Sequence, residues 1–96
     1  MINTYLICFE FRDYTDKCLS DFHQYLKDIA SEFHHALSNA IVIRTDKTKK
    51  EMHKKLLEIC QDNDVMYFIL DAELTPDTIE GWMHSSFWNL IKTQKD

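Results

Sequence analysis

Glu10 is the first side chain in the sequence that could do chemistry, and it stands at the end of an aromatic, branched run. The run Thr4-Tyr5-Leu6-Ile7-Cys8-Phe9-Glu10-Phe11 is typical of a β-strand. If the face of the strand that carries Glu10 meets a second copy of the chain, two Glu10 carboxylates approach each other and share a hard cation such as Mg²⁺. The alternative, and the commoner case, is a glutamate that pairs with Arg12 or Arg44 or is simply solvated.

The five histidines lack the spacing of a metal site. His34 and His35 are adjacent, so a strand points them to opposite faces. His23 and His53 are expected on separate helices, each without a partner four residues away, and His84 stands beside two serines. We therefore expect surface or interface histidines rather than ligands.

The three cysteines, Cys8, Cys18 and Cys60, are odd in number and widely spaced. Disulfide frameworks and structural zinc sites use closer pairs. The pattern favours buried thiols in a reducing compartment, so we expect a cytoplasmic protein.

One basic segment runs from Arg44 to Lys55. It holds six Lys and Arg against two acidic residues, six minus two giving +4, so the remainder of the chain carries −5 minus 4, or −9. Such polarity can steer phosphate groups toward Arg44, Lys47, Lys49 and Lys50, the candidate nucleic-acid-binding residues. The alternative is a solvated helix face whose lysine stems cover the edge of the core.

Length and composition narrow the classes of protein further. Ninety-six residues predict a single domain, 1–96. A single glycine excludes the glycine-rich phosphate loops, so no nucleotide cofactor is expected. No stretch approaches the roughly 18 apolar residues of a membrane span, so no membrane partner is expected. The net charge of −5 is also unlike that of a typical basic nucleic-acid-binding fold.

Apolar spacing places the first elements that must position these residues. A strand over Thr4–Phe11 precedes a helix over Thr15–Glu32, where apolar residues recur every three or four positions. The stretch Phe33–Arg44 then predicts a hairpin that turns at Ser38-Asn39, since asparagine tolerates a positive φ. One long strand with a bulge is the alternative.

The second half of the chain repeats this pattern. Thr48 and Glu51 form a capping box at the start of a helix over Thr48–Gln61. The strand over Asn63–Leu70 has an unbroken apolar run, which indicates a central strand buried on both faces. Thr75-Pro76-Asp77 opens a last amphipathic helix.

The resulting order, β-α-β-β-α-β followed by a helix, predicts an α+β chain with a ferredoxin-like antiparallel sheet and an extra C-terminal helix. In that fold two helices cover one face of the sheet. The strands are apolar on both faces, so the last helix, a second subunit or both must cover the other face. We therefore expect a homodimer.

The stretch from Thr4 to Arg12, and Phe33-His34-His35 leading into Ala40 to Lys47, resemble small bacterial proteins of the SinR family. Those proteins in turn resemble the CRISPR-associated Cas-two group of ferredoxin-like dimers. In that group an aspartate that follows an aromatic residue at the end of the first strand is the metal-binding, catalytic position. The resemblance implies the same place for Glu10 after Phe9, although glutamate is one methylene longer than aspartate.

Two main functions follow from these observations. The first is a non-catalytic homodimer that binds a nucleic acid or a partner protein, for which no cofactor is expected. The second is a Mg²⁺-dependent endoribonuclease or nuclease that uses paired Glu10 carboxylates, and only this one requires Mg²⁺. A mobile-element-encoded inhibitor protein is a third, which the acidic total allows.

Overall fold

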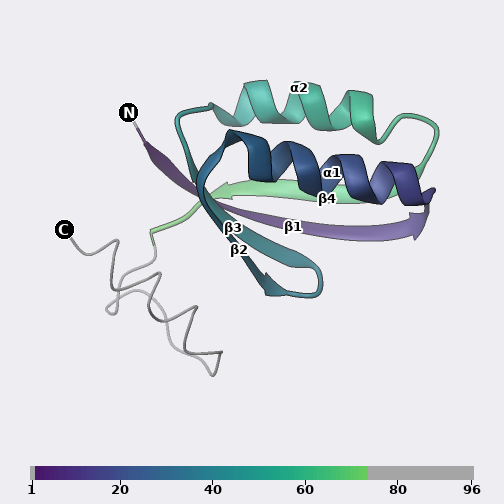
Figure 1. The fold of residues 1–96 in the computed structure, drawn as a ribbon, viewed down its shortest axis with the longest axis horizontal. Coiled ribbons are helices and arrows are strands. Elements are labelled where there is room, and N and C mark those ends of the chain that lie inside the picture. The colour runs from purple at the N-terminus through teal and green to yellow at the C-terminus, as the bar shows by residue number, and fades with distance from the viewer. Residues whose placement is uncertain (1, 74–96) are drawn as a thin grey trace.

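The structure is a computed structural model that describes residues 2–73. Its elements are β1 (Asn3–Asp13), α1 (Asp16–Ile29), β2 (Ala30–Leu37), β3 (Ala40–Thr45), α2 (Lys49–Ile59) and β4 (Asp64–Asp71) (Figure 1). The predicted α+β class and the order β-α-β-β-α-β are confirmed. The helix expected to open at Thr75-Pro76-Asp77 lies outside the described residues.

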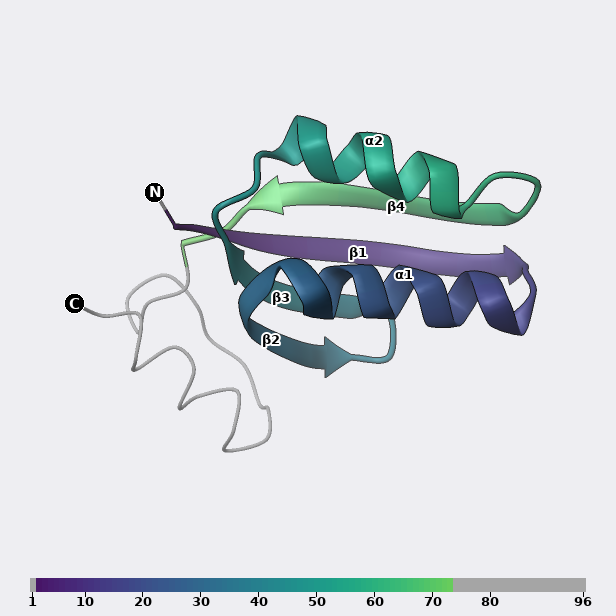
Figure 2. The ribbon, with the colours of Figure 1, turned by 45° about the horizontal axis from the view of Figure 1, so that its top comes forward.

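The four strands form one sheet in the order β2-β3-β1-β4, with every neighbouring pair antiparallel. Both helices lie on the same face of this sheet, which Figure 2 shows with the four strands side by side behind them. The arrangement is compatible with a ferredoxin-like fold. We call the face that carries no helix among residues 2–73 the open face.

The core lies between the sheet and the two helices. Alternation along β1 turns Tyr5, Ile7 and Phe9 toward the helices, and all three are buried. They pack against buried residues from every neighbouring layer, namely Phe22, Leu26, Ile41, Ile43, Met52, Leu56 and Cys60. Tyr5, Ile7 and Phe9 are therefore the side of β1 that faces the helices.

Helix α2 begins as its local sequence predicts. The Thr48 hydroxyl accepts a hydrogen bond from the Glu51 N–H, and the Glu51 carboxylate accepts one from the Thr48 N–H. This capping box satisfies two backbone donors that the first helical turn leaves unpaired. It also fixes where the lysines of the first turn lie.

Helix α1 ends three residues earlier than predicted. The expectation that it reaches Glu32 is wrong, because β2 starts at Ala30 and the stretch Ala30–Glu32 pairs with β3. The reason is a contact distant in sequence: the Thr45 hydroxyl donates a hydrogen bond of 2.8 Å to the Ile29 carbonyl. Phe33, whose spacing fits the helix, accordingly lies in β2 opposite Ile43.

The predicted hairpin is confirmed, with Ser38 and Asn39 as the turn between β2 and β3. The single long strand is therefore wrong. The turn does not use the positive φ that asparagine tolerates, since Asp62 is the one non-glycine residue with a positive φ among residues 2–73. A register shift between His34 and Leu37 instead bends the strand before the turn.

Strand β4 is an edge strand, so its predicted place at the centre of the sheet is wrong. Val65, Tyr67 and Ile69 pack toward the core, while Met66, Phe68 and Leu70 on the open face remain 48%, 55% and 47% exposed. An unbroken apolar run has two explanations. The strand lies inside the sheet, or it is an edge strand with one face that the described residues leave uncovered. The described residues favour the second.

The Thr45 hydroxyl should contribute measurably to stability. It is 1% exposed, donates to the Ile29 carbonyl and accepts from the Lys47 N–H. We expect Thr45→Val to keep the side-chain shape but lower the free energy of unfolding by about 1–3 kcal/mol, because two partly buried backbone groups lose a partner. Urea unfolding measures this change.

Thr4→Val is the matched control for Thr45→Val, because the Thr4 hydroxyl makes no hydrogen bond within residues 2–73 and lies on the open face. Its effect should stay within about 0.5 kcal/mol. Equal losses in the two variants would show that the Thr45 hydrogen bonds contribute nothing beyond the strand environment.

Candidate functional site

Glu10 lies in β1, directly opposite Met66 of β4. Alternation along the strand turns it to the open face, away from the buried Phe9 and toward solvent. Its carboxylate forms an ion pair of 3.3 Å with the Nε of Arg12, and both side chains are more than half exposed. Of the alternatives open from the sequence, the structure therefore shows pairing with Arg12.

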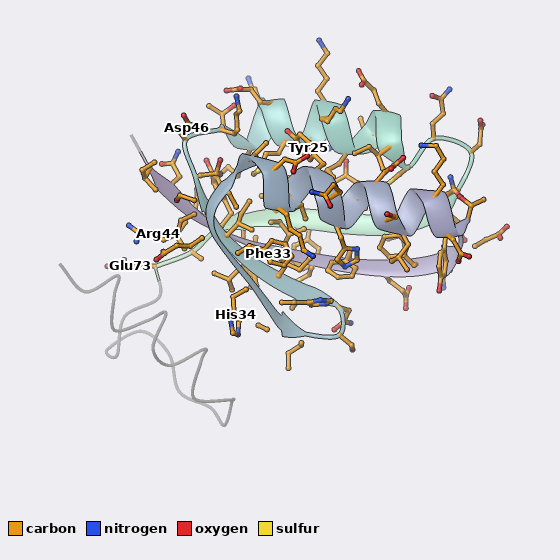
Figure 3. The ribbon with its side chains drawn as sticks, in the orientation of Figure 1. Tyr25, Phe33, His34, Arg44, Asp46 and Glu73 are labelled. Carbon is orange, nitrogen blue, oxygen red and sulfur yellow. The ribbon has the colours of Figure 1, made fainter. Side chains whose placement is uncertain are left out.

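Arg44, the other partner considered for Glu10, is engaged elsewhere. Its guanidinium forms a hydrogen-bonded ion pair of 3.0 Å with Glu32 on the neighbouring strand β2. Figure 3 shows Arg44 and Glu73 at the same end of the sheet, with Asp46 in the connection toward α2. Arg44 belongs to the open face, because its neighbours Ile43 and Thr45 turn toward the helices.

A single chain does not assemble a metal centre at Glu10 among residues 2–73. Across residues 2–73, no group of three or more His, Cys, Asp or Glu side chains is placed to hold a metal ion. One exposed carboxylate per chain supplies too few ligands for Mg²⁺, which takes six oxygens, water included. A Mg²⁺ site at Glu10 would therefore depend on a second copy of the chain.

The structure gathers three of the four basic candidates at the start of α2 and separates the fourth. Lys49 and Lys50 occupy the first turn of the helix, and Lys47 lies in the connection that precedes it. Arg44 projects from the opposite face of the sheet, so it does not share one surface with them. A phosphate group at α2 would therefore meet the lysines and not Arg44.

The lysines at α2 differ in how far they are neutralised. Lys49 forms an ion pair with Asp71 at the end of β4. Lys47 and Lys50 form no ion pair within the described part of the chain. The positive charge available to an anionic partner is therefore concentrated on Lys47 and Lys50. The charge of Lys49 is partly neutralised by Asp71, which is itself exposed.

A shallow groove of about 360 Å³ runs beside these lysines, between α2 and β4. It is lined by Lys49, Lys50, His53, Tyr67, Phe68 and Ile69. The Tyr67 hydroxyl donates to the His53 carbonyl at 3.2 Å, and burial, followed by the nearby Cys60, raises the Tyr67 pKa to about 12. This hydroxyl is thus a neutral donor at physiological pH and holds the groove wall rather than serving as a base.

The cysteines do not form a nucleophilic site. Cys18 and Cys60 are buried, as expected, whereas Cys8 is only half-buried. Cys18 of α1 and Cys60 at the end of α2 lie close enough for each thiol to affect the pKa of the other. Burial, and then the neighbouring Cys18, raises the pKa of Cys60 to about 11, so both thiols stay protonated and unreactive at neutral pH.

One group of residues was missed from the sequence, where the histidines were expected to act singly. His23 of α1 and His35 of β2 lie with their ring centres 5.3 Å apart. The predicted split of His34 and His35 between opposite faces of β2 is consistent with this, since His35 lies near Phe9 on the helix side. The missed signal is that His23 continues the apolar spacing of Leu19 and Phe22, which turns it toward the sheet.

Neither helix of the described residues has the length and apolar character needed to cross a membrane.

Substitution of Glu10 separates a surface ion pair from a metal ligand. We expect Glu10→Gln to lower the free energy of unfolding by at most about 1 kcal/mol, as loss of an exposed ion pair does. We also expect millimolar Mg²⁺ or Mn²⁺ to leave the melting temperature of the wild-type protein unchanged. Thermal scans of both proteins, with and without each ion, measure these effects.

Glu58→Gln is the matched control for Glu10→Gln, since Glu58 forms a similarly exposed ion pair with Lys55 at 3.8 Å. The opposite result would be a Glu10→Gln protein that melts higher without metal and loses a wild-type response to Mg²⁺. That result would indicate two carboxylates that repel each other until a cation binds.

Comparison with known proteins leaves the chain without an assigned family. No protein-family model, no curated protein and no solved structure matches it. The likeness to SinR-family and Cas-two proteins therefore stays an expectation from the sequence, and the functional argument depends on the geometry of residues 2–73.

Proposed function

We propose that the protein is a small, non-catalytic, Cas-two-like homodimer with a ferredoxin-like fold that binds nucleic acid in the cytoplasm. One observation carries the proposal: the open face of the sheet presents a row of large apolar side chains to solvent. Met66, Phe68 and Leu70 are each about half exposed in a single chain. In a homodimer, the second copy of the chain would cover this row.

The exposed row of β4 continues onto the neighbouring strand β1, where Leu6 and Cys8 are half-buried. Leu6 pairs with Leu70 and Cys8 pairs with Phe68, so the patch spans β4 and β1, whereas Val42 on the other side of Leu6 is only 2% exposed. Contiguous apolar patches on soluble proteins mark interaction surfaces more often than chance exposure does. A two-fold contact brings the same patch of each chain together, so an apolar patch is complementary to its own copy.

The location of the lysines supports nucleic acid as the partner. Lys49 and Lys50 lie in the helical layer, while the apolar patch lies on the open face. Dimerisation through the patch would therefore leave the lysines of both copies accessible to phosphate groups. Lys47 and Lys50, without ion pairs in the described residues, supply the cationic charge, and a protein partner of acidic character is the competing occupant.

Catalysis is outside the proposal, because the Glu10 carboxylate is occupied by Arg12 at 3.3 Å on an exposed surface. A Mg²⁺-dependent nuclease would require the dimer to displace Arg12 and bring two Glu10 residues together. A mobile-element inhibitor is supported by no specific contact among the described residues.

Dimerisation should depend on the open face and not on the helical layer. We expect light scattering at micromolar concentration to give twice the 11.5 kDa mass of one chain. Leu70→Glu should shift the protein to the monomer, because it places a charge inside the buried patch. Leu57→Glu is the matched control, since Leu57 is similarly exposed, at 54% against 47%, but lies on α2.

Two results would contradict the dimer. A wild-type protein that scatters as an 11.5 kDa monomer would remove it. A dimer dissociated by Leu57→Glu but not by Leu70→Glu would move the interface to the helical layer.

Nucleic-acid binding should follow the lysines of α2. We expect Lys49→Glu combined with Lys50→Glu to weaken binding to every DNA or RNA sequence tested. The slope of log affinity against log salt should become shallower by about one unit for each phosphate group that a lysine no longer neutralises. Fluorescence anisotropy with labelled oligonucleotides over a range of salt concentrations measures both effects.

Lys17→Glu combined with Lys27→Glu makes the same change in net charge on α1 and serves as the control. Equal weakening by the two pairs would show only a dependence on net charge. Absence of any binding by the wild-type protein at low salt would reduce the α2 lysines to a solvated helix face.

A further inference from the structure

A pocket of about 420 Å³ lies at the other end of the molecule, between α1, β1 and the β2–β3 hairpin. It is lined by Phe9, Glu10, Phe11, Tyr14, Leu19, His23, His35, Ser38 and Asn39. Phe9, Phe11 and Tyr14 supply aromatic rings to its wall, and His23 and His35 supply two imidazoles. Neither the proposed dimer patch nor the α2 lysines include His23 or His35.

The hydrogen bonds of the two imidazoles define which ring nitrogens carry protons. The Nδ1 of His23 lies 2.9 Å from the Leu19 carbonyl oxygen, and the Nε2 of His35 lies 3.3 Å from the Ser38 carbonyl oxygen. A carbonyl oxygen can only accept, so each of these nitrogens donates a proton. In the neutral rings, the Nε2 of His23 and the Nδ1 of His35 are therefore left with free lone pairs.

This pattern is the one that metal-ligating histidines show. A ligating imidazole commonly donates its other N–H to a backbone carbonyl or a carboxylate, which sets both the tautomer and the ring orientation. Here two neighbouring imidazoles each have such a backbone partner. The ring of His23 is further fixed by an edge contact of 5.6 Å with Phe9 and a stacked contact of 6.3 Å with Phe11.

The separation of the rings suits one shared ion. Two imidazoles on a tetrahedral Zn²⁺ have Zn–N bonds of about 2.0–2.1 Å, which places their ring centres about 5 Å apart. The ring centres of His23 and His35 are 5.3 Å apart, with 44° between the ring planes. The separation of the ring centres is therefore that of two imidazoles bound to one ion.

We propose that His23 and His35 form a two-imidazole binding site for a borderline divalent transition-metal ion such as Zn²⁺, with water or an added anionic ligand completing its coordination. Imidazole nitrogens suit Zn²⁺, Ni²⁺ and Cu²⁺, whereas Mg²⁺ prefers oxygen ligands. Glu10 also lines the pocket, but its carboxylate turns to the open side of the sheet and pairs with Arg12, so the two imidazoles and not Glu10 supply the ligands. Phe9 and Phe11, whose rings contact the ring of His23, form the apolar side of the site.

The experiment is a titration of the untagged, metal-free protein with ZnCl₂ by isothermal calorimetry. We expect saturable binding of one Zn²⁺ per chain. His23→Gln and His35→Gln should each weaken this binding by more than tenfold, because loss of even an outer partner of a ligand costs about 10–100-fold. His53→Gln is the matched control, since His53 lies on α2 and contacts Tyr67 instead.

A second measurement tests the assignment of the ring nitrogens. In imidazole ¹⁵N spectra of the wild-type protein, Zn²⁺ should shift the Nε2 of His23 and the Nδ1 of His35 and leave the His53 ring unchanged. Because His35 is exposed, His35→Gln should fold normally, and circular dichroism without metal confirms this for each variant.

Three results would overturn the site. The first is a wild-type protein that binds no Zn²⁺, and the second is binding that persists in the variant with both histidines replaced. The third is binding that survives both histidine changes singly but disappears in Cys60→Ser, which would place the ion at the Cys18–Cys60 pair.

Discussion

Strand β1 imposes the constraint on which the rest of the structure depends. It lies inside the sheet, paired with β3 and β4, and its side chains alternate between two faces. Both helices cover one set, Tyr5, Ile7 and Phe9, which are buried. Leu6 and Cys8 face the other way, so the same helices cannot cover them. An apolar open face is therefore a consequence of placing both helices on one side of a two-faced strand.

A second constraint fixes where the basic surface lies. The Thr45 hydroxyl joins the end of α1 to the connection before α2, because it donates to the Ile29 carbonyl and accepts from the Lys47 N–H. The Tyr5 hydroxyl donates to the Lys47 carbonyl at 2.9 Å, which ties the same connection to β1. The lysines that follow are thus placed by buried polar contacts of the core, at the end of the sheet where β1 begins and β4 ends. Their position does not depend on their own charges.

Local sequence patterns predicted those elements whose bounds depend on neighbouring residues. They failed where a contact distant in sequence sets the bounds or the position of an element. The capping box at Thr48 was predictable because both of its members lie within one helical turn. The end of α1 was not, since the stop at Ile29 comes from Thr45, sixteen residues away. The place of β4 was missed because an apolar run alone does not distinguish a central strand from an edge strand with an uncovered face. The pairing of His23 with His35 likewise needs the packing of α1 on the sheet, which no spacing within one element reveals.

The lysines of α2 and the imidazole pocket therefore lie at opposite ends of the sheet. The lysines gather where α2 begins, next to Asp71 at the end of β4, whereas the imidazoles lie beside the hairpin and the second half of β1. Glu10 is one of the residues that line the imidazole pocket, yet alternation turns its carboxylate to the open face and toward Arg12. A transition-metal ion at the imidazoles would thus add positive charge away from the lysines, without competing for the phosphate groups they would bind. The ion would instead lie near the β2–β3 hairpin. It could therefore affect a dimer through the edge strand β2, but not through the charge of α2.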